Sequence, residues 1–316
     1  APIAHLDEHI GTDTDLVQVP ATYPFTTGGV LRRAKRDGVP SVLDFHFEPD
    51  PGHAVGRAAA VCYRQLGPRT YSLADAVVVR SLAYGRSAPS LKGIPEEAWR
   101  PIPNGIDPTV FHADVQSLPH LPGPYLLFVG RLVPYKGLDV LLHALARHKP
   151  GMPLVVAGDG PLRTRLEELA RRLQVDVIWL GYVKEEELPG LYKGAALTVL
   201  PSVNRQEAFG ICLLESMACG TPVVATSLPG VADVASFGGY VARTGDPVSL
   251  SAQVRAALQA DHLDRGRRLS ERVHATFSWD AVTQRFLAVY EEVLQSRAPG
   301  GTSPLAHPLR HPVLPA

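Results

Sequence analysis

Cysteine and long apolar runs are scarce in this sequence. Its three cysteines, Cys62, Cys212 and Cys219, show neither CxxC nor zinc-ligand spacing, and such an odd, sparse set is no disulfide framework. We therefore predict a reducing, cytoplasmic environment. The longest apolar runs, such as residues 195–201, are far shorter than the roughly 18 residues of a membrane span. We expect neither a transmembrane segment nor a signal peptide.

An excess of one charge is also absent. Basic and acidic residues balance at 31 each, whereas nucleic-acid binding needs a clustered basic surface that displaces counterions. The composition therefore argues against a nucleic-acid partner. Hydrophobic residues make up 45% of the chain, which is enough to bury a core. A length of 316 residues predicts two domains.

From about residue 124 the sequence repeats a short apolar run, a Gly or Pro turn and a helical stretch. The predicted strands are 125–129, 154–157, 177–180, 197–200, 222–226 and 240–242, and the first helices are 138–147, 162–173, 185–193 and 209–218. Continuous apolar strands separated by helices are typical of a parallel sheet buried on both faces. Residues 120–275 therefore predict a doubly wound α/β domain.

The first 117 residues show a shorter version of the same pattern. Predicted strands at 16–19, 42–47 and 76–79 alternate with helical stretches around 30–36 and 56–73, and three strands make a thin sheet. Two prolines and a glycine at 101–105 predict a hinge that includes Asn104 and Gly105. We predict domains over 1–117 and 118–276, a C-terminal helix over 277–296 that docks back toward the N-terminal domain, and a flexible Pro-rich tail over 297–316.

The strongest local signal is EAFGICLLE, which runs from Glu207 to Glu215. A helix that starts near Phe209 or Gly210 leaves several unpaired backbone amides in its first turn, which form an anion site. Gly210 lets a phosphate approach the backbone closely. A less specific interpretation also stands: Glu215 pairs with an arginine and Glu207 is a carboxylate stabilised by the helix dipole.

A second signal, GRLVPYKG, begins at Gly130 and places Arg131 and Lys136 after a predicted strand. Ligands of open α/β sheets bind at the carboxyl ends of the strands. An arginine fork and a lysine point charge together suit a diphosphate, and the chain has only six lysines. Either residue alone is more often a solvated surface charge.

A third signal is weaker. Neither GxGxxG nor GxxxxGK[ST] occurs, but AGDGP, which contains Gly158, resembles half of a dinucleotide fingerprint. A turn without a ligand is at least as consistent with these residues.

Taken together, the chain resembles the retaining glycosyltransferases of the GT-B fold, glycosyl transferases group 1, which carry two glutamates separated by seven residues. The motifs that carry the resemblance are FVGRLVPYKG, VVAGDGP, LPSVNRQEAFGICLLESMACGTPVVAT and FSWDAVTQRFLAVYEEVL, with VLDFHFEPDPG, ADAVVVRS and PIPNGID in the first part. They follow the family's order over nearly all of residues 120–296. The fold implied is α/β, with two Rossmann-type doubly wound domains and a cleft between them.

The resemblance also implies a substrate, a nucleoside diphosphate sugar bound by the C-terminal domain. Gly130, Arg131, Lys136 and Gly158 would lie at the diphosphate. The backbone amides at Phe209, Gly210 and Ile211 would also bind it.

The same resemblance places the rest of the donor. Glu215 would bind the ribose, Tyr182 and Val183 would lie near the base, and Glu207 would contact the transferred sugar. His46 would lie beside that sugar as a second catalytic residue, although a histidine at a strand end is more often a hydrogen-bonded core residue.

The mechanism implied is a front-face transfer to a hydroxyl acceptor, in a glycan, a lipid or a small molecule, with no metal and no cofactor. A double displacement needs two carboxyl groups about 5 Å apart, and nothing in the sequence specifies such a pair. We expect a cytoplasmic enzyme, with peripheral contact at the inner face of the cell membrane left open, and the sequence specifies no oligomeric state.

One departure from the family concerns the beginning of the chain. Family members usually begin with a strand, a glycine-rich loop and about three further βα units before the segment that matches residues 15–20. We therefore expect an incomplete N-terminal domain. An alternative function follows: a non-catalytic protein that binds a nucleotide sugar or a partner.

Overall fold

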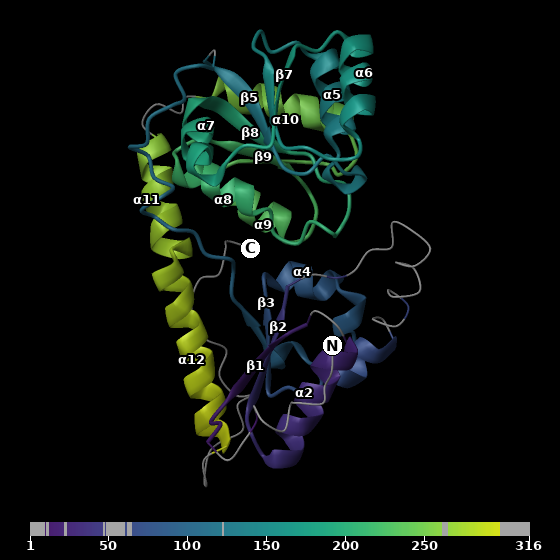
Figure 1. Cartoon of the computed structure of the whole chain (residues 1–316), viewed down its shortest axis with the longest axis vertical. Coiled ribbons are helices and arrows are strands. Elements are labelled where there is room, and N and C mark those ends of the chain that lie inside the picture. The colour runs from purple at the N-terminus through teal and green to yellow at the C-terminus, as the bar shows by residue number, and fades with distance from the viewer. Residues whose placement is uncertain are drawn as a thin grey trace. The chain divides into compact units, whose positions relative to one another are not determined.

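The computed structural model describes residues 10, 13–21, 24–46, 48, 61, 65–121, 123–260 and 265–297. These residues form two compact units (Figure 1). One unit holds the described residues up to Pro103 and those from Val282 onward, and the other holds Asn104–Ala281. The domain boundaries predicted at 117 and 276 lie inside the second unit, and the division into acceptor and donor domains stays a prediction. Cys62 and residues 298–316 of the predicted tail lie outside the described residues.

The first unit contains a parallel sheet with the strand order β1-β2-β3-β4. Its strands are β1 (Val17–Pro20), β2 (Ser41–Phe45), β3 (Ala76–Val79) and β4 (Trp99–Pro101). The helical elements are α2 (Pro24–Asp37), a helical stretch over residues 65–71, α4 (Leu82–Ser87), η2 (Pro89–Leu91) and η3 (Glu96–Ala98). The sheet thus has four described strands where the sequence predicted three. β4 escaped prediction because its three residues include an arginine and a proline, which do not make an apolar run.

The last helix, α12 (Trp279–Arg297), packs on this first sheet from Val282 onward. Val282, Val289 and Val293 share one buried cluster with Val42 of β2 and Val78 of β3. Their spacing of seven and four residues keeps the valines on one face of the helix. The helix therefore belongs to the core of the first unit.

The second unit contains a six-stranded parallel sheet with the order β10-β9-β8-β5-β6-β7. The strands are β5 (Tyr125–Val129), β6 (Leu154–Ala157), β7 (Val177–Gly181), β8 (Ala195–Leu200), β9 (Val223–Thr226) and β10 (Tyr240–Ala242). The helices are η4 (Pro134–Lys136), α5 (Leu138–Arg147), α6 (Arg163–Leu173), η5 (Glu185–Glu187), α7 (Leu188–Gly194), α8 (Ile211–Ala218), α9 (Val231–Ser236), α10 (Pro247–Gln259) and α11 (Arg265–Phe277).

Helices cover both faces of this sheet (Figure 1). Leu126 and Phe128 of β5 pack with residues of α5, α6 and α10, whereas Tyr125 and Leu127 pack with residues of α7, α8, α9 and α11. Successive residues of a strand point to opposite faces, so a strand covered on both sides must be apolar throughout. The predicted α/β class with a doubly wound C-terminal sheet is confirmed. No described helix has the length and hydropathy of a membrane span.

Candidate functional site

The second sheet reverses its winding direction between β5 and β8. The chain passes outward from β5 through β6 to β7 and then returns to β8 on the other side of β5. Ligands of open α/β sheets bind outside the carboxyl ends of the strands at such a point. The loop after β5, residues 130–137, and the loop after β8, residues 201–210, are therefore the place to look for a site.

These two loops touch through their backbones. The amide of Val203 donates to the carbonyl of Tyr135 at 2.8 Å. Gly137 has φ 65°, and a Cβ atom there would lie 2.2 Å from the carbonyl oxygen of Pro201. Glycine is therefore required for the close approach of the two loops.

The loops also carry a nearly buried ion pair. Lys136 Nζ lies 2.6 Å from Glu207 Oε2, and the two side chains are 14% and 11% exposed. Ser202 Oγ donates to the same carboxylate oxygen at 3.1 Å. Burial disfavours the charged ammonium, but the Glu207 carboxylate outweighs burial and raises the pKa of Lys136. The sequence predicted separate partners for these two residues, and the structure pairs them with each other.

The helix α8 begins directly beyond this pair. Gly210 has a left-handed backbone, with φ 77°, and precedes the first helical residue, Ile211, so the helix starts slightly later than predicted. The first N–H groups of a helix have no acceptor within it. Phe209 is buried and Ile211 is exposed. The predicted anion site thus lies in the same loop as Glu207.

Glu215 accepts a hydrogen bond from the hydroxyl group of Tyr192 at 2.6 Å. Burial raises the pKa of the Glu215 carboxyl, although the Tyr192 hydrogen bond opposes the rise. The carboxylate lines an open pocket of about 1070 Å³, together with Ile211 and Glu185. Its partner is a tyrosine, not the arginine of the less specific interpretation.

Arg131 and Gly130 lie in the loop after β5, and Gly158 lies in the loop after β6. Arg131 is exposed, and no ion pair of its side chain occurs among the described residues. A Cβ atom at Gly158 would lie 2.1 Å from the carbonyl oxygen of Gly130. Gly158 is therefore needed where the loops after β5 and β6 cross, and its role toward a ligand stays a prediction.

The other predicted residues lie elsewhere in the second unit or in the first unit. Tyr182 and Val183 follow β7, two strands from β5, and Tyr182 is 81% exposed. Gly105 packs against the Trp279 ring, because a Cβ atom there would lie 2.6 Å from Trp279 Cε3. Asn104 is the first residue of the second unit. The hinge role of Asn104 and Gly105 stays a prediction.

His46 belongs to the first unit and follows β2 directly. Its Nε2 lies 3.1 Å from Asp44 Oδ2, and its side chain is 49% exposed. Asp44, Ser202 and Tyr192 are not among the residues predicted from the sequence. The D-x-H spacing could have drawn attention to Asp44, whereas Tyr192 and Glu215 meet only because of the tertiary fold.

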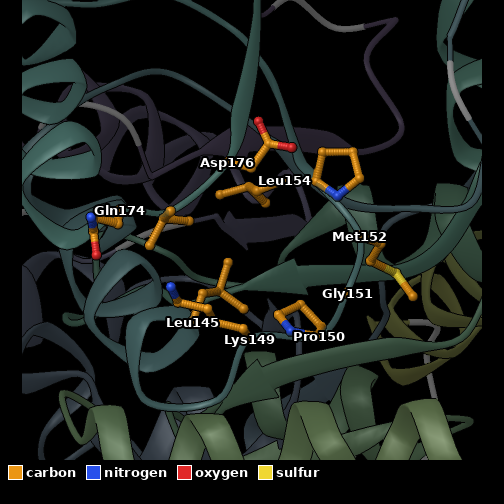
Figure 2. Close-up of a pocket in the computed structure, with 10 residues that line it drawn as sticks. Leu145, Lys149, Pro150, Gly151, Met152, Leu154, Gln174 and Asp176 are labelled. Carbon is orange, nitrogen blue, oxygen red and sulfur yellow. The ribbon is translucent and has the colours of Figure 1, made fainter.

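A smaller pocket, of about 240 Å³, lies at the opposite edge of the second sheet (Figure 2). Leu154, the first residue of β6, and Asp176, the residue before β7, line it. It is therefore at the amino ends of the strands, away from the loops of the candidate site. Across the residues that the structure describes, no three His, Cys, Asp or Glu side chains gather as a metal site would require.

Comparison with known proteins identifies the family of this chain. Residues 113–274 match the family model described as Glycosyl transferases group 1. A D-inositol 3-phosphate glycosyltransferase of Acidothermus cellulolyticus is 30% identical over 295 residues, which cover 82% of this chain and 60% of that protein. The chain thus spans 60% of the length of this relative.

Two solved structures share the fold. HepE of Anabaena, in a crystal structure with UDP, is 20% identical with a TM-score of 0.71, over 87% of this chain and 78% of that chain. The sucrose-phosphate synthase of Thermosynechococcus elongatus is 24% identical with a TM-score of 0.72, over 92% of this chain and 75% of that chain. With two parallel α/β sheets of the GT-B type and a family model that matches half of its length, this chain belongs to the group 1 glycosyl transferases.

Proposed function

We propose that this protein is a retaining glycosyltransferase that moves a sugar from a nucleoside diphosphate sugar to a hydroxyl acceptor. The observation that carries the proposal is the Lys136–Glu207 ion pair. It joins the loop after β5 to the loop after β8, and the loop after β8 leads into α8. Membership of the group 1 glycosyl transferases supports sugar transfer. UDP in the HepE structure supports a nucleotide donor for the shared fold.

The donor diphosphate lies between two cations and a helix terminus in this proposal. The exposed Arg131 offers a planar fork, and Lys136 offers a compact charge on the same loop. The first amides of α8 bind the same diphosphate in this proposal. Glu215, beside Ile211 in the open pocket, is the acceptor group for the ribose hydroxyls.

Transfer depends on where charge develops. As the glycosidic bond lengthens, negative charge grows on the leaving diphosphate, and fixed cations stabilise that state more than the ground state. The acceptor hydroxyl attacks from the face that the diphosphate leaves, and a phosphate oxygen takes its proton. Glu207 is held by Lys136 and Ser202, which supports a binding and electrostatic role for it and not a nucleophilic one.

Donor binding is tested by thermal unfolding with UDP and GDP. A ligand at about 100 times its Kd stabilises the native state by about 2.7 kcal/mol, so we expect a clear rise in Tm with one of them. Arg131→Ala should weaken binding by about 10- to 100-fold, because it removes a charge-assisted contact. Arg255→Ala, an exposed arginine on α10, is the matched control and should keep the full shift. No shift with either nucleotide would reject the donor site.

Turnover separates an enzyme from the non-catalytic alternative. We expect slow hydrolysis or transfer of the donor that binds, and its loss in Glu207→Gln with the Tm shift retained. Binding without any turnover would favour the alternative, a protein that only binds a nucleotide sugar. The anomeric configuration of the product, read by NMR, tests the retaining mechanism, and an inverted product would overturn it.

A further inference from the structure

The end of β2 brings a carboxylate and an imidazole together in the first unit. Asp44 lies in β2 and His46 follows the strand two residues later, and residues two apart along an extended chain point to the same face. His46 Nε2 and Asp44 Oδ2 are 3.1 Å apart. The pair lies at the carboxyl edge of the first sheet, where strand-end residues of α/β proteins meet ligands.

Asp44 is fixed from several sides. Its other carboxylate oxygen, Oδ1, pairs with the buried Arg80 guanidinium, which also donates to the carbonyl of Ile102 at 3.2 Å. Gln18 Nε2 donates to Oδ2 at 3.2 Å, and the hydroxyl group of Tyr290 on α12 donates to Gln18. Asp44 is only 5% exposed. The carboxylate therefore has little freedom to turn away from His46.

The charge of Asp44 supports the same geometry. Burial disfavours its ionised form, but the hydrogen bond to His46 and the positive charge of Arg80 outweigh burial, and the pKa of the Asp44 carboxyl is lowered. An ionised carboxylate accepts hydrogen bonds and cannot donate them. The neutral imidazole must therefore carry its proton on Nε2.

This tautomer determines what His46 offers to a ligand. With the proton on Nε2, the lone pair of Nδ1 is the acceptor of the ring. The half-exposed His46 side chain can then accept a hydrogen bond from a hydroxyl group. A sugar or an alcohol supplies such a group, whereas a carboxylate or a phosphate dianion does not.

We propose that Asp44 is a positioning residue, which holds His46 as the Nε2–H tautomer so that Nδ1 accepts a hydrogen bond from a hydroxyl group of a sugar or alcohol ligand. The role in transfer rests on the proposed function. The tautomer itself does not, because it is a property of the free protein.

The tautomer is tested first, by long-range 1H–15N NMR of the full chain labelled at histidine, with His46 assigned from the signal that His46→Gln removes. We expect the Nε2–H pattern for His46 in the wild-type protein, and a change of that pattern in Asp44→Asn. An Nδ1–H pattern in the wild-type protein overturns the proposal, and this result does not depend on whether Asp44→Asn folds.

Kinetics test the role in transfer. Asp44→Asn should lower kcat at least tenfold and leave KM within about twofold, since a misoriented catalytic imidazole loses transition-state contacts. In the His46→Gln background the same change should add no further loss, because the two residues act as one unit. If Asp44→Asn lowers kcat by the same factor in the wild-type protein and in His46→Gln, the two losses are additive. Asp44 then has only a structural role, and the positioning role is overturned.

The control is Asp75→Asn. Asp75 accepts from the amide of Ser41 at 2.9 Å, at the amino end of β2 and away from His46, so kcat should stay unchanged. If no donor binds and no transfer occurs, the proposed function fails and the NMR measurement alone decides the tautomer. If transfer occurs but His46 is the Nδ1–H tautomer, the proposed function stands and this inference fails.

Discussion

Glu215, the proposed ligand of the donor ribose, is a buried carboxyl group whose ionisation opposes folding. Burial raises its pKa in the folded protein, so the folded state binds this proton more tightly than the unfolded state. The stabilising contribution is then fully present below the unfolded-state pKa, about 4.3, and is lost as the pH rises through the folded-state pKa. In its ionised form the Glu215 carboxylate therefore destabilises the fold.

Glu215→Gln should make the protein more stable at neutral pH, because an amide is not ionised and its oxygen still accepts from Tyr192. We expect Tm to rise by about 2–4 °C at pH 7.5, equivalent to about 1 kcal/mol. The advantage should shrink as the pH falls and the wild-type carboxyl takes up its proton. Thermal unfolding between pH 5 and pH 8.5 checks this.

Glu168→Gln, at an exposed position of α6, is the control and should leave Tm unchanged. The same Glu215 variant should bind UDP or GDP more weakly. A variant that is less stable than the wild-type protein at every pH would contradict the account of Glu215.

At the scale of elements, the loops after β5 and β8 depend on a glycine at their contact. Gly137→Ala puts a methyl group against the carbonyl of Pro201 and also strains a left-handed backbone. We expect a loss of at least 3 kcal/mol in the free energy of unfolding, together with loss of nucleotide binding. Urea unfolding checks the first result, and the thermal shift with UDP or GDP checks the second.

Gly151 offers a matched comparison for this variant. It has φ 74°, close to that of Gly137, but nothing lies within 4 Å of a Cβ atom there. Gly151→Ala should therefore cost only the backbone strain, about 1 kcal/mol. Equal losses in the two variants would show that the close approach of the loops contributes nothing.

The elements of the second sheet were predictable because each strand is buried on both faces and must be a continuous apolar run. The predicted strands 125–129, 154–157 and 240–242 have the observed bounds of β5, β6 and β10. β4 was missed because its backbone pairing with β3 depends on the tertiary fold. The observed start of α8 is later than the predicted one because Gly210 has a left-handed backbone. A hydrophobic pattern does not reveal that conformation.

The candidate site was predictable as a set of residues but not as a set of contacts. Lys136 and Glu207 are separated by 71 positions in the chain, and each could be selected from its own motif. Their ion pair requires β5 and β8 to be neighbours, which follows from the strand order. The Tyr192–Glu215 hydrogen bond could not be predicted either, because it also depends on which elements are neighbours in the fold.

At the scale of the whole molecule, a bound nucleotide should protect selected segments only. We expect UDP or GDP, whichever binds, to slow hydrogen–deuterium exchange in residues 130–137 and 201–212 by up to about 100-fold at 100 times its Kd. Residues 149–153 and 174–176, around the pocket of Figure 2, should exchange unchanged. Mass spectrometry of exchanged peptides checks this, and protection confined to the second set would move the binding site to the other edge of the sheet.

The Lys136–Glu207 contact means that one cation of the loop is already neutralised before any ligand arrives. An incoming anion must replace a carboxylate partner and recover the free energy of that contact. Chloride carries a single charge on one atom, whereas the diphosphate of the proposed donor carries several anionic oxygens on two linked groups and can engage an arginine fork and a lysine at once. The ion pair thus favours, in the proposed function, ligands with two linked anionic groups over simple anions.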